Sequence, residues 1–220
     1  MAKSILNSFQ IKTLSDFKKS SLSKKFYLSG GTALAEFYLH HRLSEDLDFF
    51  TQEELDLDEL KKLINAVCKK IPVKKVEFQH GYGLYTFFIT SEKNEKHKID
   101  FGQYPFSPIE QLKDFDGIFV ESLFDIAVNK THTIAFRPRL RDFIDLYCII
   151  KQKPDWGFQE LLKKSFEKFE MSADALQVGQ NLLEVEKQVD MPIMIKKVSL
   201  TDVKKFFLNE AKMLEKEIFK

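Results

Sequence analysis

Two adjacent glycines constrain the fold of this chain most, because they join an apolar run to a segment with helical periodicity. Residues 26–29 are mostly apolar, Gly30 and Gly31 follow, and residues 32–41 carry apolar side chains at helical spacing. A strand that runs into a glycine turn and then a helix presents free backbone N–H groups and the positive end of a helix dipole at one point. We therefore expect Gly30, Gly31 and Thr32 to bind a phosphate.

Two carboxylates follow in a second apolar run. Asp46 and Asp48 lie in the sequence DLDFF at residues 46–50. Side chains alternate along a strand, so both carboxylates point to one face. Carboxylates in apolar surroundings are costly unless their charge is compensated, and paired carboxylates bind hard divalent cations such as Mg²⁺. The pattern predicts catalytic metal ligands, and the alternative is a pair of solvated turn carboxylates.

Asp100 is a third candidate ligand, in an apolar run at residues 98–101. If this run pairs beside the strand at residues 46–50, Asp100 completes a catalytic carboxylate cluster. Two Mg²⁺ ions about 3.5–4 Å apart can then clamp an in-line displacement at phosphorus, and Asp100 can help to deprotonate an attacking hydroxyl. Lys98 faces the same side by parity, where it meets a phosphate, partly neutralises the carboxylates, or is simply a solvated strand residue.

The second half of the chain supplies further polar candidates for nucleotide binding. Lys130 is a point charge suited to a triphosphate. Asp125 stands five residues earlier, on a different helix face, so the two do not form a simple ion pair. Asp142 and Asp145 share one helix face, where they either contact substrate or form a structural network with Lys130 or nearby arginines. The roles of Asp125, Arg141, Asp142 and Asp145 stay open.

Other polar residues near these motifs have a structural interpretation or an open one. His40 and His41 end a helix, where cations are favourable, and we interpret both as structural. Arg42 and Ser44 precede Asp46 and either contact phosphate or fix the loop. Trp156 follows a Pro-Asp turn and is expected to anchor helices to each other.

The periodicity divides the chain into an α/β half at residues 1–120 and a helical half at residues 121–220. In residues 1–20, Ser15 and Asp16 are expected to cap a short amphipathic turn. Strands are expected at residues 26–29, 46–50, 73–78, 84–90 and 98–101, and helices at residues 32–41, 56–70, 121–131, 139–151, 158–169, 173–189 and 199–219. Because both halves carry polar motifs, we expect the site in a crevice that the helical half closes.

Composition limits the class of protein. The 220 residues carry a formal net charge of +1, so global charge does not predict nucleic-acid binding, although a local basic groove stays possible. No apolar run approaches the about 20 residues of a membrane span, and no signal peptide is evident. Cys68 and Cys148 lack metal-ligand spacing and are expected to be reduced, packed thiols. We expect a cytoplasmic protein with no membrane partner.

Four motifs in order resemble those of the AbiEii/AbiGii-type toxins, a group of the DNA polymerase β-like nucleotidyltransferase superfamily. The glycine turn with Asp46-Leu47-Asp48-Phe49 resembles the first motif, and Lys98-Ile99-Asp100-Phe101 resembles the second. Residues 125–130 and 141–147 resemble the third and fourth. The resemblance covers residues 26–150, and beyond them only the helical character agrees.

The resemblance implies an α+β fold, with a small mixed sheet and flanking helices followed by a helical bundle. It implies Mg²⁺-dependent transfer of a nucleotidyl group from an NTP, with tRNA or protein as acceptor and a cognate antitoxin as partner. The chain is shorter than the longer members of the group. Of everything that the resemblance implies, the identity of the acceptor therefore carries over to this chain least well. The alternatives are a catalytically inactive module of the same fold, which binds nucleotide, RNA or a partner protein, and a kinase-like γ-phosphoryl transfer.

Overall fold

The structure is a computed structural model that describes residues 4–218, with side chains through Leu214. The described residues up to Tyr38, together with Leu43–Ser122, form one compact unit, which we call the sheet unit. Leu39–Arg42 and the described residues from Leu123 onward form the second, the helical unit. The short stretch Leu39–Arg42 therefore belongs to the helical unit although it lies between two elements of the sheet unit.

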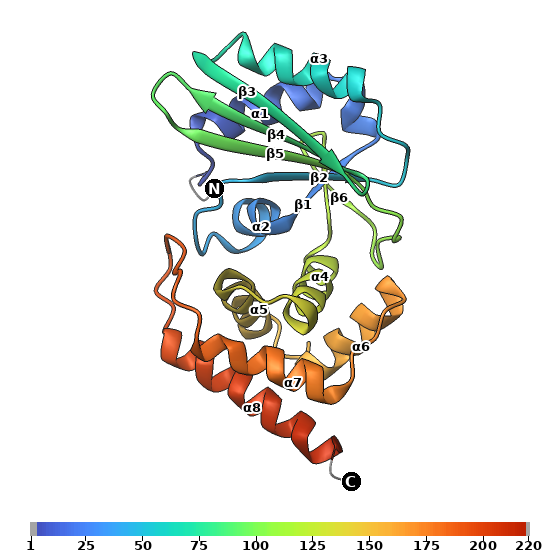
Figure 1. The fold of residues 1–220 in the computed structure, drawn as a ribbon, viewed down its shortest axis with the longest axis vertical. Helices are drawn as coiled ribbons and strands as arrows, with labels where there is room; N and C mark the ends of the chain where they lie inside the picture. The colour runs from blue at the N-terminus through green and yellow to red at the C-terminus, as the bar shows by residue number, and fades with distance from the viewer. Residues whose placement is uncertain (1–3, 219–220) are drawn as a thin grey trace. The chain divides into compact units, whose positions relative to one another are not determined.

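The sheet unit is built on seven strands with mixed pairing (Figure 1). In spatial order they are β3 (Val73–Gly81), β4 (Leu84–Ser91), β5 (Lys96–Gln103), β2 (Leu47–Thr51), β1 (Tyr27–Ser29), β7 (Ile118–Val120) and β6 (Lys113–Phe115). The pairs β2–β5 and β1–β7 are parallel and the others are antiparallel. The α+β class with a mixed sheet is thus confirmed.

Helices α1 (Ser8–Lys19) and α3 (Leu57–Cys68) pack together on one face of the sheet, and α2 (Gly30–Leu34) lies on the other (Figure 1). On the first face Phe17 of α1 stacks on Phe49 of β2, with ring centroids 4.3 Å apart, and Phe49 stacks on Phe101 of β5 at 5.2 Å. All three rings are fully buried. Because strand side chains alternate, Asp48 and Asp100 point to the opposite face.

The helical unit comprises α4 (Leu123–Phe136), α5 (Leu140–Gln152), α6 (Phe158–Phe169), α7 (Ala175–Leu183) and α8 (Leu200–Ile218). Helix α4 packs against α5, α6 and α7, and α8 packs against α5 and α7. Phe207 of α8 is fully buried and meets the edge of Phe143 of α5 at 4.8 Å. Trp156 meets Phe124 of α4 edge-on at 5.0 Å, which confirms its predicted role as an anchor between helices.

Several predicted boundaries were wrong. Ser15 and Asp16 lie inside α1, whose N-cap is Asn7 in a capping box with Gln10. The helix expected at residues 32–41 is α2 followed by a π-helical turn, Ala35–Leu39. The hairpin of β6 and β7 was not predicted either, because its strands are too short to show an alternating pattern.

Other differences are smaller. Short 3₁₀ turns occur at Ser21–Lys24 and Glu184–Glu186, and the second ends the helix expected at residues 173–189. Helix α4 continues beyond the expected end at residue 131. Residues 1–3 and 219 of the expected elements lie outside the described part of the chain.

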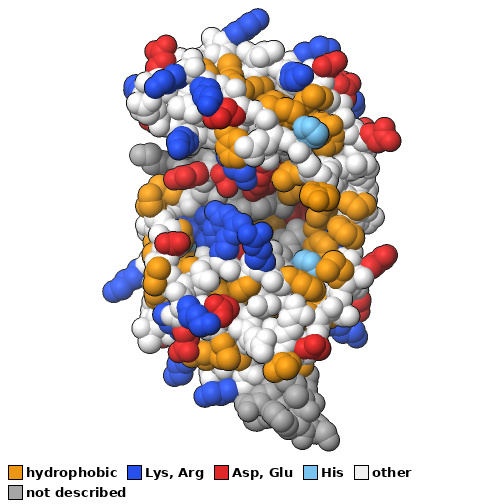
Figure 2. Space-filling view, in the orientation of Figure 1, with side chains coloured by type: hydrophobic (Ala, Val, Ile, Leu, Met, Phe, Trp, Pro, Cys, Tyr) orange, Lys and Arg blue, Asp and Glu red, His pale blue; other side chains and the backbone are white. Residues whose placement is uncertain are grey.

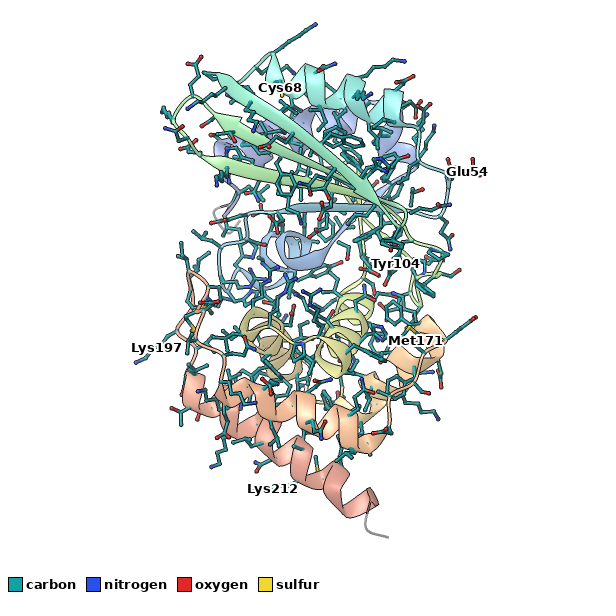
Figure 3. All side chains as sticks on the ribbon, viewed as in Figure 1. Glu54, Cys68, Tyr104, Met171, Lys197 and Lys212 are labelled. Carbon is teal, nitrogen blue, oxygen red and sulfur yellow. The ribbon has the colours of Figure 1, made fainter. Side chains whose placement is uncertain are left out.

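The described residues show mixed surface charge and free thiols, as the composition predicted. No helix among the described residues is long and apolar enough to cross a bilayer. On the face of the sheet unit drawn in Figure 2, lysines and arginines are interspersed with aspartates and glutamates. Cys68 on α3 (Figure 3) and Cys148 on α5 are free thiols, and burial raises the pKa of Cys148 to about 11.

Truncation of Phe49 is expected to destabilise the sheet unit strongly. Phe49→Ala should lower the free energy of unfolding by about 3–5 kcal/mol, because it opens a cavity between two stacked rings. Urea unfolding followed by far-UV circular dichroism measures the loss. Phe119→Ala on β7 is the matched control, since that ring is 38% exposed, and it should cost much less. Equal losses in the two variants would contradict the packing described.

Candidate active site

The glycine turn brings Asp48 against the start of α2. Gly30 has φ +72°, and a Cβ at this position would collide with Oδ2 of Asp48. Only glycine allows both the backbone conformation and this close approach. Thr32 donates its hydroxyl hydrogen bond to the backbone carbonyl of Asp46. The sheet unit thus places the predicted phosphate turn, which includes Gly31, beside the Asp48 carboxylate and the backbone of Asp46.

The second strand pairing brings in the third carboxylate. Strand β5 pairs parallel with β2, in a register that sets Asp100 directly beside Asp48. The predicted role of Asp100 as a third metal ligand required this pairing. Oδ1 of Asp100 accepts a hydrogen bond of 2.7 Å from the hydroxyl of Thr86 on β4, which fixes the orientation of the carboxylate. The sequence motifs did not single out Thr86, because its position opposite Asp100 comes from the β4–β5 register.

Lys98 lies among these carboxylates. Its Nζ is 2.5 Å from Oδ2 of Asp100 and 3.9 Å from Oδ2 of Asp46. Burial lowers the pKa of the Lys98 ammonium, but the hydrogen bond to Asp100 and the charges of Asp100, Asp46 and Asp48 outweigh it and raise the pKa above its ordinary value. Lys98 therefore carries a full positive charge and neutralises part of the acidic cluster.

The donor set suits a hard cation. Among the described residues no three His, Cys, Asp or Glu side chains converge closely enough to hold a metal ion as they stand. The positive charge at this place comes instead from the Lys98 ammonium, which contacts Asp100 and Asp46. Carboxylate oxygens on two adjacent strands are the ligands that Mg²⁺ prefers. The chemistry of Asp46, Asp48 and Asp100 therefore suits a divalent cation, although in this structure Lys98 holds two of the three carboxylates.

The predicted residues of the second half form a buried ionic network within the helical unit. Nζ of Lys130 lies 2.7 Å from Oδ1 of Asp142 and 2.8 Å from Oδ2 of Asp145. Asp145 also accepts hydrogen bonds from Nε2 of His41 at 2.8 Å and from Arg42, whose Nε and Nη2 lie at 2.7 and 2.8 Å. Asp145 is fully buried, and its three partner residues come from both segments of the unit.

The electrostatics show what this network does. Burial raises the pKa of the Asp145 carboxyl, but the charge of Lys130 and the hydrogen bonds from Arg42 and His41 outweigh it and hold the pKa well below its ordinary value. Burial lowers the pKa of Lys130, and the charges of Asp145 and Asp142 outweigh it, so the pKa is raised. Asp145 thus ties Leu39–Arg42 to α4 and α5, and a nucleotide would reach its oxygens only by displacing these partners.

Asp125 and its neighbours have their own partners. Asp125 is fully buried and forms an ion pair of 2.8 Å with Nζ of Lys168 on α6, which also donates to Asn129. Lys130 pairs instead with Asp142 and Asp145. Lys168 escaped prediction, because 43 residues separate it from Asp125. The backbone carbonyl of Ser44 accepts a hydrogen bond of 2.8 Å from the Gln10 side chain, which fixes the loop before Asp46.

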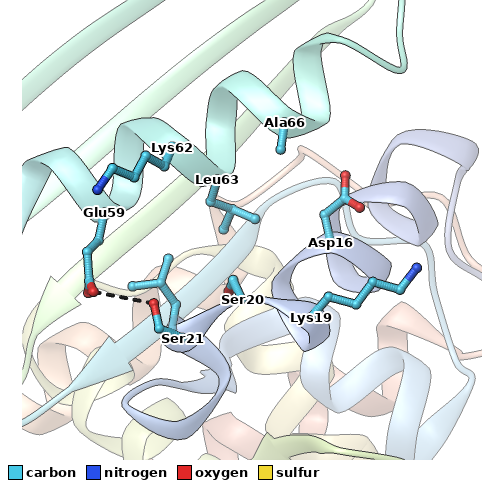
Figure 4. A pocket seen from close by; sticks show the side chains of 9 residues that line it. Asp16, Lys19, Ser20, Ser21, Glu59, Lys62, Leu63 and Ala66 are labelled. Carbon is cyan, nitrogen blue, oxygen red and sulfur yellow. Dashed lines mark hydrogen bonds between the residues drawn. The ribbon is translucent and has the colours of Figure 1, made fainter.

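A pocket of about 380 Å³ lies in the sheet unit beside α1 and α3 (Figure 4). Asp16, Lys19, Glu59 and Lys62 contribute polar side chains to its wall. None of the predicted site residues lines it, and its helices cover the sheet face opposite to the one from which Asp48 and Asp100 project. This pocket is therefore separate from the candidate active site.

Comparison with known proteins identifies the class. The family model described as nucleotidyl transferase AbiEii toxin, type IV TA system, matches residues 12–215, nearly the whole chain. The chain belongs to this family and is a nucleotidyltransferase, as its four motifs predicted.

The chain is also similar to individual proteins and solved structures. An uncharacterized protein of Aquifex aeolicus (strain VF5) is 32% identical over 153 residues, which are 67% of this chain and 69% of the relative. A putative nucleotidyltransferase from H. pylori matches with a TM-score of 0.62 and 16% identity over 95% of this chain and 92% of its own. JHP933 from Helicobacter pylori matches with a TM-score of 0.60 and 16% identity over 95% and 90%. At this identity the two structures show a shared fold.

Replacement of Asp145 should destabilise the protein in a pH-dependent way. Asp145→Asn leaves the buried cations around it without their counter-charge, at a cost of about 3–5 kcal/mol at neutral pH. A carboxyl with a depressed folded pKa contributes stability above its unfolded pKa, near the ordinary 3.8, and loses it as the pH falls towards the folded value. The gap between wild type and variant should be constant above about pH 5 and shrink in more acidic solution.

Urea unfolding at a series of pH values measures this gap. Asp116→Asn is the matched control, because that side chain is 97% exposed in the β6–β7 turn and should show neither effect. A gap under about 1 kcal/mol at neutral pH, the size typical of a surface ion pair, would contradict the network described.

Proposed function

We propose that this protein transfers a nucleoside monophosphate group from an NTP to a hydroxyl of an RNA, such as tRNA, or of a protein, and releases pyrophosphate. The observation that carries the proposal is the register of β2 and β5, which sets Asp48 beside Asp100 on the sheet face that also bears the glycine turn. Carboxylates beside a phosphate-binding turn are the groups that a metal-assisted displacement at phosphorus needs.

The glycine turn binds the phosphates in this proposal. Backbone N–H groups of Gly30, Gly31 and Thr32 at the start of α2 donate to the NTP. The hydrogen bond from Thr32 to the Asp46 carbonyl keeps the turn and the carboxylates together. The turn therefore orients the α-phosphate relative to the acidic cluster.

Asp46, Asp48 and Asp100 hold Mg²⁺ in this proposal, with two ions expected. Bound Mg²⁺ supplies Lewis-acid stabilisation of charge on the phosphate oxygens. Asp100, held by Thr86, orients the acceptor hydroxyl and takes up its proton. Lys98, once released from Asp100, is free to meet a phosphate.

Lys130 contacts the triphosphate in this proposal. Its raised pKa keeps the ammonium charged while Asp142 and Asp145 hold it in place. We assign these two aspartates a positioning role in nucleotide binding, because both hold Lys130 and the remaining contacts of Asp145 are to His41 and Arg42.

The biological role follows the family description. We propose that the protein is the toxin of a toxin–antitoxin or phage-defence system, acts in the cytoplasm and is neutralised by a cognate antitoxin protein. The match to a family of type IV toxins supports this role.

Loss of one carboxylate should abolish transfer. Asp48→Asn or Asp100→Asn should lower the rate by about 100-fold or more, the scale of losing one preorganised electrostatic contact. The assay follows label from each α-³²P-labelled NTP into total RNA and into lysate protein. Asp116→Asn, exposed in a turn, should keep full activity. Binding of NTP without any transfer would contradict the proposal, and label that transfers only from γ-³²P-ATP would indicate a kinase.

Expression should also arrest growth if the protein is a toxin. Induced wild type should stop the growth of a bacterial host, and Asp46→Ala should relieve the arrest because it removes a metal ligand without affecting the buried core. Growth curves at matched expression, checked by immunoblot, measure the effect, with Asp116→Ala as the control. Equal growth with wild type and Asp46→Ala would contradict the toxin role and leave the transferase chemistry untouched.

A further inference from the structure

A second pocket, of about 540 Å³, lies wholly within the helical unit and contains none of the residues assigned to catalysis. Its wall is formed by residues of Leu39–Arg42, by α5, and by the segment that leads into α8, which includes Lys197 (Figure 3). A cavity of this size holds a molecule as large as a nucleotide unit. His41 in its wall stands five residues before Asp46 in the sequence.

The pocket concentrates positive charge. Lys151, Lys196 and Lys197 line it and are exposed, against one carboxylate, Asp202. Nζ of Lys196 donates one hydrogen bond, of 2.5 Å, to the Leu39 carbonyl, so this ammonium is held at the wall. In a chain with a net charge of only +1, three lysines around one pocket form a local site for a polyanion.

His41 adds a group that needs a ligand. Its side chain is 1% exposed, and Nε2 bonds to Asp145 at 2.8 Å. Because Asp145 is ionised, Nε2 carries the hydrogen, and in the neutral ring Nδ1 is then an acceptor. Among the described residues Nδ1 has no hydrogen-bond partner. A buried acceptor without a donor is costly, so a ligand that offers a hydroxyl group would be stabilised here.

Tyr147 contributes an aromatic surface beside the lysines. It is half-buried on α5, and Nζ of Lys151 lies 5.6 Å from its ring centroid. A lysine beside an aromatic ring, in a positively charged pocket, is the combination that binds single-stranded nucleic acid through phosphate and base together.

We propose that this pocket binds a single-stranded segment of an RNA acceptor. The lysines bind backbone phosphates, and Nδ1 of His41 accepts a hydrogen bond from a ribose 2′-hydroxyl, the group that distinguishes RNA from DNA. This proposal rests on the nucleotidyl transfer proposed above and selects RNA over protein as its acceptor. Exposed lysines on two separate segments fit successive phosphates of a strand better than the adjacent phosphates of one free NTP.

The salt dependence of RNA binding tests the phosphate contacts. Fluorescence anisotropy of the full-length protein with a short fluorescein-labelled single-stranded RNA gives the affinity over a range of salt concentrations. Each phosphate contact contributes about 0.7 to the slope of log K against log salt for a single strand. Lys151→Gln and Lys197→Gln should each lower the slope by about that amount, and Lys163→Gln on α6, also exposed, should leave it unchanged.

His41→Gln tests the hydroxyl contact. The NH₂ group of the Gln amide still donates to Asp145, while its one acceptor, the carbonyl oxygen, is displaced from the position of Nδ1. Wild type should prefer RNA to DNA of the same sequence, and the variant should lose that preference while its affinity for DNA stays unchanged. Circular dichroism confirms that each variant is folded.

Several outcomes would overturn this proposal. The first is an equal salt slope in wild type and both lysine variants. The second is equal affinity of wild type for RNA and DNA. The third is displacement of RNA by ATP or by an acidic peptide at the same concentration of charge. Transfer of label to protein with no RNA binding would overturn it and leave the transferase function standing. RNA binding that depends on Lys151 and Lys197, with no transfer to any acceptor, would support the pocket and contradict the transferase function.

Discussion

The parallel pairing of β2 with β5 is the constraint on which the candidate active site depends. Its register puts Asp48 beside Asp100, and two like charges on adjacent strands repel unless a cation lies between or beside them. Lys98 supplies that cation in the described structure. In the proposed reaction Mg²⁺ would have to displace this lysine from the carboxylates, so the metal affinity would reflect both the carboxylates and the release of Lys98.

The helical unit depends on a different buried charge. Asp145 cannot lie in the interior alone, because an unpaired buried carboxylate is strongly unfavourable. Its partners come from Leu39–Arg42 and from α4, so satisfying one charge joins segments about a hundred residues apart in the chain. This explains why a short stretch between two elements of the sheet unit belongs to the helical unit. It also explains why Lys130 remains protonated despite its burial.

The sequence predicted what depends on local pattern. Alternation placed Lys98 and Asp100 on one face, helical spacing located α3 and α6, and the motifs identified the family. What it missed depends on distant partners. Lys168 pairs with Asp125 from another helix, Thr86 reaches Asp100 through strand register, and the β6–β7 hairpin is too short to carry a period. Asp142 and Asp145 stayed ambiguous for the same reason, because a shared helix face does not reveal what packs against it.

Overall composition concealed the distribution of charge that matters. A net charge of +1 argues against a nucleic-acid partner only if the charges are evenly mixed, and around the second pocket three lysines stand against one carboxylate. Carboxylates gather on one face of the sheet, where they need a cation, and lysines gather around a pocket that includes His41, where an acceptor atom lacks a donor. Under the proposal that the acceptor is RNA, the enzyme joins two polyanions, and a metal site and a phosphate-backbone site then require opposite signs of charge.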